Sequence, residues 1–276
     1  MGTIREQLTN MFSKVMAGTV TREEGTMLIN HLARDGHAET TKELAFLIDN
    51  PPPGVFPKTI LHTIALSRNK AFFNLMISSL EHKNEDLSIL AAQELARLKT
   101  SDAKHVLTEH LNSEAYHVRK VSALALVEGF SDGPDILKKH MLQHPEPFYR
   151  STSAEALTKC GEAGIGVLIS ILQLENTGAA VTAAQALEGI ARKLTGADIP
   201  KIVDSLMLAG DRKDSLLATE LLKLISAIGS RAKGFEGYVK VFLDHPSKAV
   251  RDDAANTIKI MGLGVTDKAP LITDNG

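Results

Sequence analysis

The residues best suited to chemistry in this sequence are its 10 histidines. An imidazole can bind a metal or move a proton near neutral pH, but a zinc site needs three or four converging ligands. His140 and His144 stand four residues apart, yet a predicted turn intervenes and no third ligand joins them at a suitable spacing. His82, His144 and His245 each stand in a turn directly before a predicted helix, where they can cap that helix or face solvent. We therefore expect no metal site.

A nucleophile is equally hard to find. Cys160 ends a predicted helix at an apolar position, which indicates a buried and inert thiol. The glycine-rich stretch 161–166 has no strand before it, so it predicts a turn rather than a nucleotide-binding loop. Gly-x-Ser-x-Gly and phosphate-loop motifs are absent from the sequence. We expect no catalytic residue and no cofactor.

Charge and composition exclude further classes. The 276 residues carry 31 Lys and Arg against 33 Asp and Glu, a formal net charge of −2. Phosphate binding needs clustered cations, so this balance argues against a nucleic-acid partner. The sequence starts without the apolar region of a secretory signal, and no apolar run approaches the roughly 20 residues that span a bilayer. With its single cysteine, the chain is expected to be a cytoplasmic protein without a membrane span.

The elements that position all these residues are helices arranged in a repeat. Aromatic residues make up only 4% of the chain, Trp is absent, and the apolar share is mostly Leu and Ala, which favour helices. Self-comparison aligns six segments in register, the first four spaced by 31, 31 and 30 residues. They are 80–99, 111–130, 142–161, 172–191, 207–226 and 243–262.

Each segment contains a turn and then a helix with a small-small-x-x-Leu core, such as Ser122-Ala123-Leu124-Ala125-Leu126. Small residues let helices approach closely. Shorter amphipathic helices are predicted between the copies, at 102–111, 135–142, 165–172, 199–208 and 235–243. The unit is a helical hairpin that cannot bury its apolar face without a neighbour.

The flanking regions fit the repeat less well. Residues 1–69 are interpreted as capping helices at 4–16, 22–34 and 38–48, followed by a degenerate first repeat with a helix at 59–66. The Pro-rich stretch 50–57 predicts an extended loop. We expect one continuous repeat array over 70–262 and a flexible tail over 263–276.

The second helices resemble those of HEAT repeats, in particular the short bacterial HEAT-like kind related to phycobilin lyases. The likeness lies in HVRKVSALAL (117–126), YRSTSAEAL (149–157) and AVRDDAANTI (249–258). It implies an all-α fold, a right-handed α-solenoid of about seven or eight helical hairpins. The arginine typical of such repeats is present as Arg119, Arg150 and Arg251, but Ser88, Ala180 and Ser215 replace it elsewhere, so any arginine ladder must be interrupted.

Two enzymatic or ligand-holding alternatives stay open on this resemblance. HEAT-like DNA glycosylases use a basic face with aromatic residues including Trp, which this chain lacks. Bilin lyases hold a pigment, and the sequence does not separate such a groove from any other. The HEAT-like di-iron hydroxylases are a poorer match, because their metal ligands lie in His-Glu dipeptides and none occurs in this chain.

The variable positions of the second helices should align along the concave face of such a solenoid. Polar residues there flank scattered apolar ones, Ile89, Val181, Leu216 and Leu224, which either line a groove or pack between helices. We interpret this face as the binding site of a protein or peptide, which makes the chain a non-catalytic scaffold or adaptor. The candidate binding residues are Gln93, Arg97, Lys120, Leu124, Glu128, Glu155, Lys159, Gln185, Glu220 and Asn256.

Overall fold

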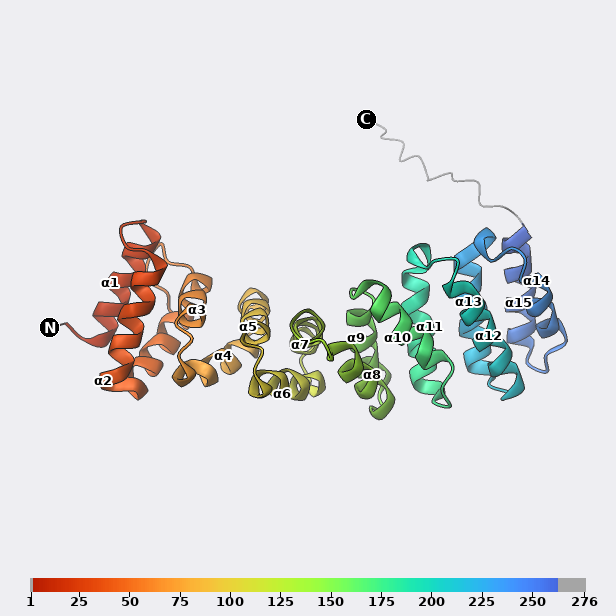
Figure 1. Cartoon of the computed structure of the whole chain (residues 1–276), viewed down its shortest axis with the longest axis horizontal. Coiled ribbons are helices and arrows are strands. Elements are labelled where there is room, and N and C mark those ends of the chain that lie inside the picture. Colours follow the sequence, from red (N-terminus) through yellow and green to blue (C-terminus); the bar gives the residue numbers. More distant parts are fainter. Residues whose placement is uncertain (1, 263–276) are drawn as a thin grey trace, which may run out of the picture. The chain divides into compact units, whose positions relative to one another are not determined.

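A computed structural model describes residues 2–262, and within them the chain is all-helical (Figure 1). The chain divides into two compact units, with the division between Gly133 and Pro134. In both, a first helix is followed by a turn and a second helix that packs on it. The predicted all-α fold of helical hairpins is confirmed. The boundary expected at 69/70 and the single continuous array stay predictions, and the tail at 263–276 lies outside the described residues.

The first unit begins with three helices that precede the regular hairpins. These are α1 (Ile4–Met16), α2 (Arg22–Asp49) and α3 (Pro57–Leu66). Two hairpins follow: α4 (Phe73–Leu80) with α5 (Glu85–Leu98), and α6 (Ser101–Glu109) with α7 (Tyr116–Gly129). Short 3-10 turns at Lys70–Phe72 and His110–Asn112 adjoin α4 and α6. The second helices α3, α5 and α7 pack side by side in that order.

The second unit repeats this arrangement in four hairpins. They pair α8 (Gly133–Gln143) with α9 (Pro147–Leu157), α10 (Gly161–Leu172) with α11 (Thr177–Gly189), α12 (Asp198–Asp211) with α13 (Ser215–Ile228), and α14 (Glu236–Lys240) with α15 (Lys248–Gly262). Three 3-10 turns lie between them, at Ala191–Lys193, Gly229–Ala232 and Val241–Asp244. The second helices α9, α11, α13 and α15 contact one another in sequence.

The N-terminal helices agree with expectation in all but one respect. Thr3 and Thr21 start α1 and α2 with reciprocal capping boxes to Glu6 and Glu24. The helices predicted at 22–34 and 38–48 are both present within α2, and the one difference is that they meet directly at a kink, where the backbone of Gly36 is non-helical. The Pro-rich stretch leads directly into α3, and Pro57 is the first residue of that helix. Proline is tolerated there because the backbone N–H that it lacks would have no partner within the helix.

The turns between first and second helices are built from the repeated His and Arg. His82, His144 and His245 each accept a backbone N–H bond on Nδ1 from the residue two positions on, at 2.9, 3.2 and 3.1 Å. These bonds hold the turns, but the expected capping of the helices by histidine is not found at α5, where Asn84 is the cap, or at α9, which has no side-chain cap. Arg119, Arg150 and Arg251 each donate through Nη1 to the carbonyl oxygens six and five residues earlier. The guanidinium thereby ties each turn to the helix that follows it.

Where the arginine is missing, other side chains donate hydrogen bonds to the carbonyl oxygens of the turn. Ser88 donates to the Leu80 carbonyl at 2.6 Å. Ahead of α11, where Ala180 stands, Arg212 from the end of α12 donates to the carbonyls of Gln173 and Leu174, both at 3.0 Å. The expected interruption of the arginine ladder is therefore present, and a neighbouring hairpin fills one of the gaps.

Replacing Arg150 by Gln should lower the free energy of unfolding by about 1.5–3 kcal/mol, because it removes charge-assisted bonds at a buried turn. Urea denaturation followed by circular dichroism measures the loss. Arg192→Gln is the control, since Arg192 is exposed on a 3-10 turn of the same unit. Equal stability of the two variants would contradict a role for the arginine in the turn.

Burial of the small residues in the second helices generates a second stability prediction. Ala184 on α11 is 0% exposed, whereas Ala255, the aligned residue on the last helix α15, is exposed. Ala184→Asp should cost about 3 kcal/mol or more, because it buries an unpaired charge, and Ala255→Asp should cost far less. Thermal and urea unfolding of the two variants would contradict the repeat register if their stabilities fell together.

Candidate functional site

The predicted binding residues lie on the exposed side of the second helices, with two qualifications. Leu124 is half-buried and Glu220 is buried. The other eight are exposed. Five candidates belong to the first unit, on α5 and α7, and five to the second, of which four lie on α9, α11, α13 and α15 and Lys159 lies in the turn after α9.

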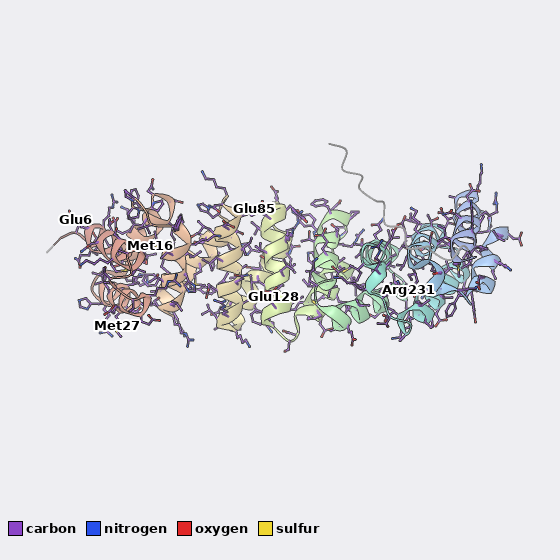
Figure 2. All side chains as sticks on the ribbon, turned by 90° about the horizontal axis from the view of Figure 1, so that it is seen from above. Glu6, Met16, Met27, Glu85, Glu128 and Arg231 are labelled. Carbon is purple, nitrogen blue, oxygen red and sulfur yellow. The ribbon has the colours of Figure 1, made fainter. Side chains whose placement is uncertain are left out.

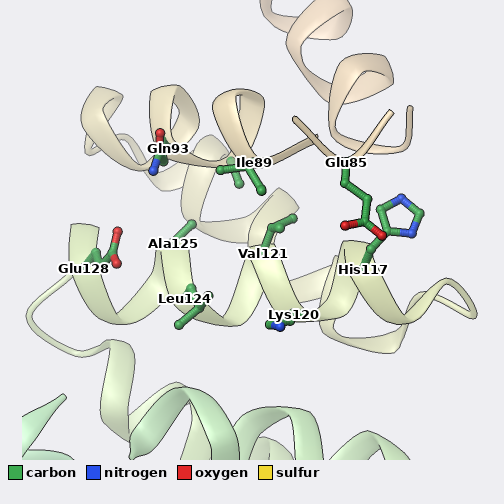
Figure 3. A pocket seen from close by; sticks show the side chains of 10 residues that line it. Glu85, Ile89, Gln93, His117, Lys120, Val121, Leu124, Ala125 and Glu128 are labelled. Atoms are coloured by element: carbon green, nitrogen blue, oxygen red, sulfur yellow. The ribbon is translucent and has the colours of Figure 1, made fainter. Parts of the chain in front are cut away.

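In the first unit, α5 and α7 enclose a groove of about 180 Å³, here called the α5/α7 groove. Figure 3 shows Ile89 and Gln93 of α5 opposite Val121 and Ala125 of α7. Ile89 is 41% exposed although it is apolar. Lys120 and Leu124 complete the lining from the predicted set. The walls of this groove are therefore apolar, and a polar amide projects among them.

Charged groups mark both ends of the α5/α7 groove. Glu85 and His117 lie together at one end, and Glu128 lies at the other (Figure 2, Figure 3). Neither glutamate takes part in an ion pair within residues 2–262. The Nε2 atom of His117 is buried and has no hydrogen-bond partner there either. Both ends thus retain unused hydrogen-bonding capacity.

A second hollow of about 240 Å³ continues the α5/α7 groove past Glu128. It shares Gln93 and Glu128 with the first and adds Arg97. The guanidinium of Arg97 is bound to Glu94 at 2.6 Å, and Glu94 also faces His62 Nδ1 at 3.3 Å. The charge of Arg97 is therefore largely neutralised from within the chain.

The second unit has hollows at the corresponding places. One of about 360 Å³ lies between α9 and α11 and is lined by Glu155 and Gln185 among others. Another of about 230 Å³ lies between α13 and α15 and contains Lys223 and Asn256. Lys159 is exposed in the turn after α9 and lines neither of them. Successive second helices thus leave a hollow between them in both units.

On α13 the exposed face is rotated by about one residue relative to the sequence alignment. Lys223 and Ala227 are exposed there, while Glu220 and Leu224 point inward. The apolar positions whose role the sequence left open consequently differ from one another. Ile89 and Leu216 are exposed, Val181 is half-buried and Leu224 is fully buried.

The residues first considered for chemistry have structural partners. His140 Nδ1 lies 2.9 Å from Ser153 Oγ, and its ring centroid is 5.4 Å from that of His144. Cys160, expected to be buried, is half-buried, and its Sγ lies 3.5 Å from the Ala156 carbonyl. Across residues 2–262 no three His, Cys, Asp or Glu side chains converge as metal ligands would. Nor does any helix in that range have the length and apolarity to cross a membrane.

Sequence reasoning missed five residues of the groove lining, namely Glu85, Ala92, His117, Val121 and Ala125. Helical spacing was the signal that pointed to them, because Glu85 precedes Gln93 by two turns and Val121 precedes Leu124 by one. Their residue types concealed their place in the groove. Val121 follows the pattern of a core residue, and Glu85 that of an ordinary first-turn acid.

Comparisons with known proteins return helical proteins of low similarity. No protein-family model and no curated protein matches the chain. Among solved structures, human deoxyhypusine hydroxylase is similar at 13% identity and a TM-score of 0.38, over 94% of this chain and 96% of that one. A designed armadillo repeat protein has 14% sequence identity and a TM-score of 0.34, and the match covers 68% of this chain and 99% of the designed one. A mutant of Kap121p has 14% sequence identity and a TM-score of 0.39, and the match covers 92% of this chain and 33% of the Kap121p chain.

These likenesses carry no argument about function. The fold assignment comes from the hairpins of the chain itself, and the site from its own grooves.

The Glu220 and Lys223 pair yields a pH prediction. Lys223 Nζ lies 2.8 Å from Glu220 Oε1, and this hydrogen bond raises the pKa of Lys223 above its ordinary value. The stabilisation is therefore fully present below the pKa of an unfolded lysine and is lost as the pH rises through the higher folded pKa. In an NMR titration of the methylated lysines, Glu220→Gln should lower the pKa of Lys223. Glu175→Gln, remote in the same unit, should leave it unchanged, and equal effects would contradict the pairing.

Proposed function

We propose that this chain is a non-catalytic scaffold or adaptor that binds a protein or peptide along the exposed face of its second helices. The observation that carries the proposal is the recurrence of hollows between successive second helices. They lie between α5 and α7, between α9 and α11, and between α13 and α15. Repeat proteins bind extended partners over series of such equivalent positions.

The size of the α5/α7 groove favours a peptide over a compact ligand. Its two adjoining hollows of about 180 and 240 Å³ are each smaller than the roughly 300–1,000 Å³ of typical small-molecule pockets. They lie in line and share Gln93 and Glu128. Such hollows fit single side chains of an extended segment that runs along the two helices.

The composition of the α5/α7 groove suggests which peptides it prefers. An apolar centre with a polar rim is the anatomy of a protein interface, and Ile89, Val121 and Leu124 supply that centre. The carboxylates of Glu85 and Glu128 at its two ends form no ion pair within the described residues, and they outnumber the one cation of its lining, Lys120. An apolar residue with Lys or Arg on either side complements this distribution of charge.

The test is selection from a random peptide library displayed on phage, panned against the immobilised full chain. We expect enrichment of apolar residues flanked by Lys or Arg. Affinity of an enriched peptide, measured by fluorescence polarisation, should fall at least about tenfold in the double variant Gln93→Arg with Leu124→Glu, because an apolar anchor site is lost.

The matched control is His105→Arg with Glu109→Lys, two exposed residues on the first helix α6. Its affinity for the enriched peptide should lie within about twofold of that of the unaltered chain, because surface substitutions outside an interface change affinity little. Circular dichroism verifies that both double variants are folded. Selection of no peptide, or equal losses in both variants, would overturn the proposal.

A further inference from the structure

A larger pocket lies in the first unit, away from the α5/α7 groove. It is formed where α3 passes into α4 and where α5 passes into α6, and its volume is about 340 Å³. It shares no residue with the α5/α7 groove or with the hollow that continues it. Unlike those hollows, it reaches the size range of small-molecule sites, about 300–1,000 Å³.

The interior of this pocket is apolar. Ile64 and Met76 are buried at its floor, and Phe73 and Leu98 are half-buried. These four side chains come from three different helices, α3, α4 and α5. The aliphatic or aromatic part of a ligand bound among them would be removed from water. This favours binding by roughly 25 cal/mol of free energy for each Å² of apolar surface buried.

The mouth of the pocket carries two cations that the chain leaves unpaired. Arg68 and Lys70 are both exposed, and neither forms an ion pair within the described residues. Asp102 is the one acidic residue of the lining. The charged side chains around the pocket therefore sum to about +1, which favours an anionic group near Arg68 and Lys70.

The turn that presents these cations is rigidly held. Arg68 has a φ of 49°, a left-handed conformation that non-glycine residues rarely adopt. Its N–H bonds to the Ala65 carbonyl at 3.1 Å. Asn69 bonds through its side chain to both the Ala71 N–H and the Asn30 side chain, at 3.0 Å each. These bonds set the backbone that carries Arg68 and Lys70, and Lys99 and Lys213 take the same left-handed conformation after α5 and α12.

From the apolar interior, the unpaired cations and the fixed turn, we propose that this pocket binds a small organic carboxylate with an apolar body. The carboxylate lies against Arg68 and Lys70, and the body fills the space among Ile64, Phe73 and Leu98. This site is independent of the peptide groove.

Octanoate and 1-octanol are suitable probes, because they share the apolar chain and differ in the head group. Added to the isotope-labelled full chain, octanoate should cause saturable NMR shifts of the amides in 64–76 and 98–102, at a lower concentration than octanol does. Arg68→Glu with Lys70→Glu should weaken octanoate at least about tenfold, because both attractive charges are reversed. It should change octanol binding little.

The control is Lys83→Glu with Lys139→Glu, which makes the same change of charge at two exposed residues outside the pocket and outside the α5/α7 groove. It should leave octanoate binding within about twofold, since exposed charges at a distance are screened by salt. Octanoate binding no tighter than octanol, an equal loss in the control, or shifts confined to α5 and α7 would each overturn the proposal. Because the pocket and the groove share no residue, its failure would leave the peptide proposal standing.

Discussion

Close contact between successive second helices is the constraint on which the rest of the structure depends. A single hairpin leaves one apolar face uncovered, so each must be covered by the next. The helices approach so closely that side chains are excluded at some points. A Cβ atom added to Gly129 at the end of α7 would lie 2.7 Å from the Cβ of Ala96 on α5. Similarly, a Cβ on Gly178 would lie 3.0 Å from the guanidinium of Arg150.

This constraint also separates the structural residues from those free to vary. The inner sides of the second helices carry mainly apolar and small residues, and the turns before α9 and α15 are held by the same pair of His and Arg. The outer sides carry no such requirement. Residues such as Gln93, Lys120 and Glu155 consequently differ between repeats while they occupy equivalent places. A series of related hollows with different chemistry follows from that arrangement.

Much of the fold could be predicted from the sequence because a repeat tests each assignment several times. The six second helices of the aligned segments agree with expectation. The rotation of α13, which buries Glu220, could not be predicted, because wider spacing before that copy leaves its register undetermined by one residue. The pocket at Arg68 was missed because it joins non-repeating residues from four helices, α3 to α6, and from the turns between them.

The central claim is that the outer face of the second helices, and not that of the first helices, contacts a protein partner. The most direct measurement is photo-crosslinking in cells with benzoylphenylalanine placed either at Gln93 on α5 or at His105 on α6. The account predicts a discrete adduct of higher mass from position 93 and none from position 105. Adducts from position 105 alone, or the same adducts from both positions, would contradict it.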